Sequence, residues 1–185
     1  MTIASAKEVI DFWFKEGHDE YLFTQNADFD AEIRAKFYDT WERGRQGLLF
    51  EWRETFEGLL AEIIVLDQFS RNLQRGSQLS YSQDGMALVL AQYAIKHPDF
   101  KKQAVNQKSF AILPFMHSES KEMHQITEKL YMELESETHT KSMKEHKKII
   151  DTFGRYPYRN EVMGRESTPE ELDFINGNDL SFTKT

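Results

Sequence analysis

Apolar residues recur every three or four positions along most of the chain, which is the spacing of one face of an α-helix. Residues 29–41 are the clearest case, because Phe29, Ile33, Phe37 and Trp41 would all lie on one helix face. The alternation of apolar and polar residues that is typical of β-strands does not recur. The pattern predicts an all-α protein of about eight antiparallel helices, over residues 5–16, 29–43, 54–73, 83–96, 102–113, 118–134, 143–153 and 168–176.

Capping residues mark the expected starts of several of these helices. Ser5 with Glu8, and Thr168 with Glu171, have the spacing of a capping box, in which each side chain accepts a hydrogen bond from the backbone N–H of the other residue. Ser118 is the expected N-cap of the sixth helix. These positions give the helix boundaries more firmly than the apolar pattern alone.

The length of 185 residues is typical of one compact domain. No stretch between the expected helices has the composition of a linker. We therefore expect one helical domain over residues 1–177, followed by a flexible polar tail over residues 178–185.

Composition and charge exclude several classes of function. The chain has 31 acidic and 23 basic residues and a net charge of −8, which argues against nucleic-acid binding, since that depends on Lys and Arg neutralising phosphates. It has no cysteine, so disulfides and thiolate sites are excluded. The longest apolar run, at residues 59–66, is too short to span a membrane, and the N-terminus lacks the pattern of a secretory signal. We expect a cytoplasmic protein without nucleic-acid or membrane partners.

Charged side chains fall on the apolar face of the third expected helix. Asp67 and Arg71 lie within its apolar stripe, although such residues are rarely buried unless they are paired. They form either an internal ion pair or part of a cavity wall. Other helices place polar residues on their apolar faces or next to apolar segments in the same way, namely Asp84, His117, Glu119 and His146. For Asp84 and Glu119, a position in the first helical turn near the positive end of the helix dipole is a simpler explanation.

The segment 155–165 concentrates arginine in an otherwise acidic chain. Arg155 and Arg159 flank Pro157, which restricts the backbone, so both guanidinium groups would be held on a stiff loop. Guanidinium groups match the geometry of carboxylates and phosphates. The segment predicts an anion site, or alternatively a structural link from these arginines to inward carboxylates such as Asp67 or Glu119.

Five short motifs resemble those of a known family: Val9–Phe14, Leu66–Asn72, Pro114–Glu119, Phe153–Asn160 and Gly164–Thr168. On these motifs the chain resembles the uncharacterised bacterial family catalogued as domain of unknown function 924. The resemblance implies a single all-helical domain, similar to tetratricopeptide-like bundles of helical hairpins, and it supplies no catalytic roles. Family members often have proline at the position of Ser70 and histidine at the position of Tyr158.

Histidine and carboxylate residues raise the question of a metal site. His117, His146, Glu119 and Asp67 are ligand types that suit several divalent ions, but no helix carries two ligands one turn apart. His124 falls opposite Ile126 and is expected in solvent. There is also no phosphate-binding glycine loop and no dinucleotide-binding motif. We therefore expect no metal and no cofactor.

Three functional hypotheses remain open. The first is a binding module that holds a small carboxylate or phosphate ligand, or a peptide terminus, in an inner pocket formed by Asp67, Arg71, His117, Glu119, His146, Arg155 and Arg159. The second is a hydrolase-like enzyme in which His117 or His146 acts beside Glu119 as a general acid or base. The third is an internal network of ion pairs that binds nothing. Neither the ligand nor the oligomeric state follows from the residues.

Overall fold

The computed structural model describes residues 2–177, which contain helices and no strand. The predicted tail, 178–185, lies outside the described residues. Counting α3, the π-helical segment and α4 as one helix, the described residues contain the eight predicted helices. Their bounds are α1 Ala6–Trp13, α2 Ala27–Arg45, α3 Phe56–Ile63, the π-helix Ile64–Phe69, α4 Ser70–Leu73, α5 Asp84–Ala94, α6 Val105–His117, α7 Lys121–Met132, α8 Glu137–Phe153 and α9 Pro169–Gly177.

The helix starts follow the capping residues with one exception. The capping boxes of Ser5 with Glu8 and of Thr168 with Glu171 are both present. The prediction for Ser118 was wrong, because its backbone is extended and it ends α6. The N-cap of α7 is Ser120, whose hydroxyl accepts a hydrogen bond from the backbone N–H three residues later.

The third predicted helix, 54–73, is interrupted by a π-helical segment at Ile64–Phe69. Such segments are rare in proteins and are frequent at functional sites. At its end, the Ser70 hydroxyl donates to the Leu66 carbonyl oxygen and accepts a hydrogen bond from the Trp41 indole N–H at 2.8 Å. The π-helical segment carries Asp67.

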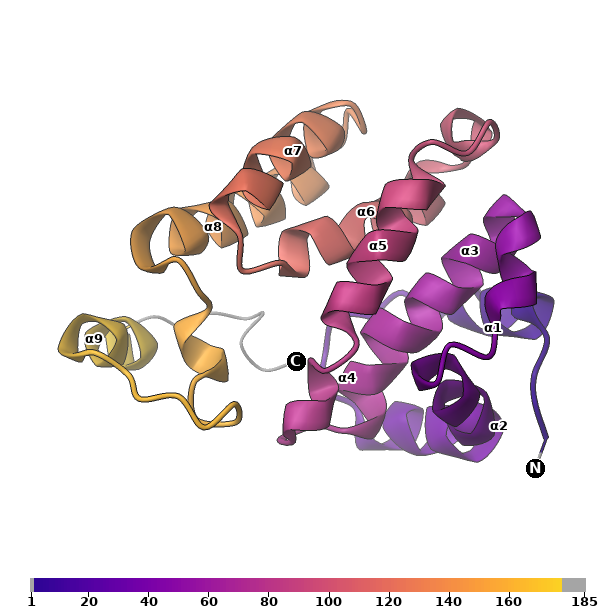
Figure 1. Ribbon diagram of the computed structural model, residues 1–185, viewed down its shortest axis with the longest axis horizontal. Helices are drawn as coiled ribbons and strands as arrows, with labels where there is room; N and C mark the ends of the chain where they lie inside the picture. Colours follow the sequence, from indigo (N-terminus) through magenta and orange to yellow (C-terminus); the bar gives the residue numbers. More distant parts are fainter. Residues whose placement is uncertain (1, 178–185) are drawn as a thin grey trace.

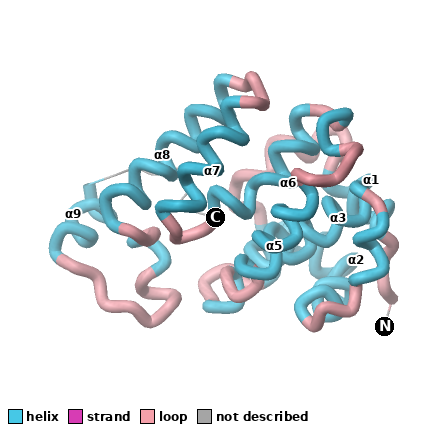
Figure 2. The backbone as a smooth tube through the Cα atoms, turned by 45° about the horizontal axis from the view of Figure 1, so that its top comes forward, coloured by secondary structure: helices cyan, strands magenta, loops and turns pink. Residues whose placement is uncertain are grey.

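The helices form two groups that are joined by α6 (Figure 1). Helices α1 to α5 lie on one side, where α3 packs against both α1 and α5. Helices α7 and α8 run side by side on the other side, and α9 lies beyond them (Figure 2). Because α6 packs against α3, α5, α7 and α8, it lies between the two groups.

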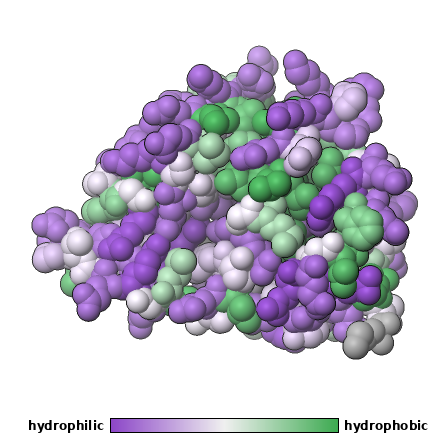
Figure 3. All heavy atoms as spheres, in the orientation of Figure 1, coloured by the Kyte–Doolittle hydropathy of each residue, from purple (hydrophilic) through white to green (hydrophobic). Residues whose placement is uncertain are grey.

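One large cluster of buried apolar side chains extends from α1 to α8, and a smaller one, around Ile150 and Tyr156, lies under the C-terminal segment. On the face shown in Figure 3, hydrophilic residues cover most of the surface and apolar ones gather over the area of α5 and α6. Among residues 2–177, no helix is both long and apolar enough to cross a membrane.

Candidate functional site

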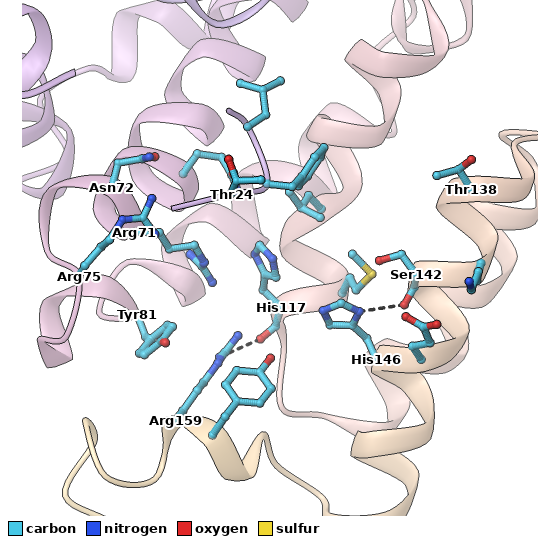
Figure 4. Close-up of a pocket in the computed structure, with 18 residues that line it drawn as sticks. Thr24, Arg71, Asn72, Arg75, Tyr81, His117, Thr138, Ser142, His146 and Arg159 are labelled. Atoms are coloured by element: carbon cyan, nitrogen blue, oxygen red, sulfur yellow. Dashed lines mark hydrogen bonds between the residues drawn. The ribbon is translucent and has the colours of Figure 1, made fainter. Parts of the chain in front are cut away.

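A cavity of about 380 Å³ lies where segments far apart in the sequence meet. Four predicted site residues line it: Arg71 from α4, His117 from the end of α6, His146 from α8, and Arg159 from the short 3-10 turn at Pro157–Arg159 (Figure 4). The two histidines come from the facing helices α6 and α8, and the two arginines approach from the other side. The loop before α2 covers part of the cavity with Leu22, Phe23 and Thr24.

Asp67 lies behind the cavity wall and orients two of these residues. Its side chain is 1% exposed, and its Oδ1 is 2.7 Å from Nδ1 of His117 and 3.2 Å from Nη1 of Arg71. Its Oδ2 accepts a hydrogen bond from the Gln68 amide at 2.5 Å. Asp67 therefore fixes the positions of His117 and Arg71 and does not itself line the cavity.

Asp84, the first residue of α5, links the two arginines of the cavity. Its carboxylate accepts two hydrogen bonds from Arg71, at 2.9 and 3.0 Å, and one from Nη1 of Arg159 at 3.3 Å. Arg159 lies between the rings of Tyr81 and Tyr156, with its guanidinium carbon 4.5 Å from each centroid. Cations are attracted to aromatic faces at such distances, so both arginines are held firmly in place.

Arg159 keeps hydrogen-bonding capacity after these contacts. A guanidinium group has five N–H donors. Nη1 of Arg159 donates to Asp84 and to the His117 carbonyl oxygen, whereas its buried Nε has no hydrogen-bond partner among residues 2–177. At least this one N–H donor of Arg159 is therefore without an acceptor in the described part of the chain.

Glu119 and Arg155 do not line this cavity. Glu119 accepts hydrogen bonds from Arg165, at 2.5 and 3.0 Å, and from the backbone N–H of Tyr156 at 2.8 Å. Arg155 forms a bidentate pair with Glu171 of α9 at 2.6 and 2.7 Å. Both residues link the C-terminal segment to the bundle, and we leave them out of the proposed site.

The prediction that His124 lies in solvent was wrong. Its side chain is fully buried, and its Nε2 is 2.9 Å from the Ser118 carbonyl oxygen. The buried face of α7 carries His124, Thr127 and Tyr131, whereas Ile126 is exposed. The apolar spacing indicated the neighbouring face, because this helix buries polar residues whose side chains bond to backbone carbonyl oxygens.

The structure adds cavity residues that the sequence analysis missed. Arg75 and Asn72 extend the wall on the side of Arg71, and Arg75 pairs with Asp30 at 2.6 Å. Lys141 and Glu145 lie near His146 on α8. Arg75 follows Arg71 by four residues but lies beyond the end of α4, so the helical repeat does not place it. The remaining additions come from loops or from the next turn of a helix and include Tyr81, Thr138, Ser142 and Tyr158.

Burial and the neighbouring charges set the protonation states in the cavity. Burial alone would raise the pKa of Asp67, but attraction to Arg71 and the hydrogen bond from His117 outweigh it and hold the pKa well below its usual range. Burial and the charge of Arg71 lower the pKa of His117 despite Asp67. Asp67 is thus ionised and His117 is neutral near pH 7. Because the Asp67 carboxylate accepts the hydrogen bond, Nδ1 of His117 carries the proton and Nε2 is left as an acceptor.

His146 makes stability depend on pH. Burial lowers its pKa from 6.5 to about 3, so the unfolded chain binds more protons than the folded one between these values. Its contribution to stability is present above pH 6.5 and is lost as the pH falls. We expect the free energy of unfolding to fall by about 2 kcal/mol from pH 7 to pH 5 through this residue. Urea unfolding of the wild type and of His146→Phe at both pH values measures it, and an equal loss in the two proteins would contradict it.

Among residues 2–177, no group of three or more histidine, aspartate or glutamate side chains is arranged to hold a metal ion. The candidate metal ligands instead form ion pairs and hydrogen bonds with other groups of the protein. Asp67 pairs with His117 and Arg71, and Nδ1 of His146 donates to the Ser142 carbonyl oxygen at 2.8 Å.

Comparison with protein families matches residues 9–179 to the bacterial proteins of unknown function called DUF924. The chain belongs to this family. A solved structure of a protein of unknown function from Agrobacterium tumefaciens is similar to the DUF924 chain, with 32% sequence identity and a TM-score of 0.88. The match covers 94% of this chain and 97% of the other. A search of curated proteins gives no match. The comparisons therefore agree with the resemblance inferred from the motifs.

Proposed function

We propose that the protein is a binding module whose inner cavity holds a small carboxylate or phosphate ligand. One observation carries the proposal: the charged side chains that line the cavity are mostly cationic, in a chain of net charge −8. They are Arg71, Arg75, Lys141 and Arg159, against Glu145 alone. An anion is the ligand that this lining favours.

The arrangement of the paired carboxylates supports the same proposal. Asp67, Asp84 and Asp30 hold the arginines, but none of these carboxylates lines the cavity. An anion in the cavity would approach the cationic groups first. Arg159 is the residue that we expect to bind it, because Arg71 already donates to Asp67 and Asp84. The carboxylate at a peptide C-terminus presents the same chemistry to Arg159 as a small acid does.

Calorimetric titration with inorganic phosphate and with propionate, at low ionic strength, tests this proposal. We expect Arg159→Lys to weaken binding about tenfold or more, because it keeps the charge but loses the planar fork. Lys141→Gln, at the edge of the cavity, should weaken binding less. Lys144→Gln is the matched control, since Lys144 is exposed on the same helix and does not line the cavity.

Two results would contradict a binding module. One is a wild-type protein that binds neither phosphate nor propionate, which would favour an ion-pair network that only stabilises the fold. The other is equal binding by Arg159→Lys and Lys144→Gln. Urea unfolding of each variant shows whether it is folded under the titration conditions.

The Asp67–His117 pair supports a second candidate, a hydrolase-like enzyme. A buried carboxylate that orients a neutral histidine beside a cavity is the arrangement of a general base and its orienting group. In that case His117→Gln should lower ester or phosphoester hydrolysis by about 10²- to 10⁴-fold while propionate binding is kept. Wild-type protein without activity on p-nitrophenyl esters and phosphates would contradict the enzyme hypothesis but not the binding module.

A cytoplasmic location stays a prediction from the sequence.

A further inference from the structure

A second cavity, of about 240 Å³, adjoins the first. The two cavities share five lining residues: Phe23, Leu113, Met116, Thr138 and Ser142. Leu113 and Met116 lie on α6, and Thr138 and Ser142 lie on α8. The same side chains therefore separate the two spaces, and a ligand long enough to pass them would occupy both.

The second cavity differs from the first in chemistry. No arginine, lysine, aspartate or glutamate lines it. Its wall is formed mainly by Phe110, Leu113, Met116 and Tyr131, which are all buried. Burial of an alkyl group there is favoured, because each CH₂ group removed from water adds to the hydrophobic stabilisation.

Phe23 is the exposed aromatic residue at the junction. Its side chain is 55% exposed, although it lines both cavities. It stacks on Phe110, with ring centroids 5.6 Å apart and an angle of 9° between the planes. An alkyl chain that passes from one cavity to the other would contact Phe23 and cover part of its exposed surface.

We propose that the ligand is an amphipathic acid, with a carboxylate in the first cavity and an unbranched alkyl chain in the second. This inference rests on the proposed function, because it places the charged group beside Arg159. It adds the chemical class of the ligand: a fatty acid of medium length. The polar end is held by the arginines, and the chain passes Phe23, Leu113 and Met116 into the apolar space.

Calorimetric titration with octanoate and propionate tests the inference, since the two acids share the carboxylate and differ in chain length. We expect octanoate to bind wild-type protein at least about tenfold more tightly than propionate. Phe23→Ser should reduce this preference, because it removes an apolar contact with the alkyl chain and so weakens octanoate binding more than propionate binding. Ser109→Phe, which places a ring at the wall of the second cavity, should do the same.

Phe50→Ser is the matched control, because Phe50 is 57% exposed and lines neither cavity. Equal affinities of octanoate and propionate in the wild type would overturn the inference and leave the proposed function intact. An equal loss of octanoate affinity in Phe23→Ser and Phe50→Ser would overturn it too. If neither acid binds the wild-type protein, both the inference and the proposed function are wrong. If octanoate binds equally well to Arg159→Lys, the placement of the carboxylate is wrong.

Discussion

Arg71→Met is expected to lower the free energy of unfolding by about 3–5 kcal/mol. The arginine is 8% exposed and forms ion pairs with Asp67 and with Asp84. Methionine fills a similar volume but has no charge. The variant leaves the fully enclosed Asp67 beside His117 and the Gln68 amide without its arginine, and a buried carboxylate that has lost its cationic partner is strongly destabilising.

Urea unfolding measures this effect. Two further variants test whether the unpaired charge of Asp67 causes it. Asp67→Asn combined with Arg71→Met removes both charges and should recover part of the lost stability. Arg45→Met removes one partner of a half-exposed pair with Glu42 and should cost no more than about 1 kcal/mol. A loss below about 1 kcal/mol in Arg71→Met would show that Arg71 does not compensate Asp67.

Gly58→Ala is expected to destabilise the protein by about 3 kcal/mol or more. An added Cβ would lie 1.8 Å from the Trp52 carbonyl oxygen and 2.6 Å from its carbonyl carbon. Both are backbone atoms of the 3-10 turn Phe50–Glu54, so no side-chain rotation relieves the clash. The turn or the start of α3 would have to move.

Gly85→Ala is the control for Gly58→Ala. Gly85 lies in α5, and no atom lies within 4 Å of the added Cβ. Alanine should stabilise this helix by about 0.5–1 kcal/mol, because it restricts the unfolded chain and favours the helix. Thermal or urea unfolding compares the two variants, and a similar loss of stability in both would contradict the close packing of Gly58 against the turn.

The helices could be predicted from the sequence because each carries an apolar face at a spacing close to the helical repeat. The π-helical segment at Ile64–Phe69 could not, since all its residues are buried and no polar face shows the change of period. The buried face of α7 was also missed. His124 and Thr127 are polar, yet they lie in the interior, where their side chains bond to backbone carbonyl oxygens of Ser118 and Met123.

Residues of the candidate site could be predicted where their position around a helix places them among apolar neighbours. Arg71 and His146 lie among apolar neighbours on their helices, and the structure places both at one cavity. Partners across the fold were not predictable in this way. Glu119 pairs with Arg165, and Arg155 with Glu171, because loop geometry brings them together and leaves no pattern in the sequence. The second cavity likewise depends on how α6 and α8 approach each other.

Both proposals on the ligand require that side chains from distant segments surround one ligand-binding cavity. The direct test is a nuclear magnetic resonance titration of the histidine ring signals with octanoate. We expect the signals of His117 and His146 to shift together and to saturate at the same concentration, because both rings line the cavity. His97, which lies outside it, should not respond. Unchanged signals of His117 and His146 at saturating octanoate, or an equal response from His97, would contradict the claim.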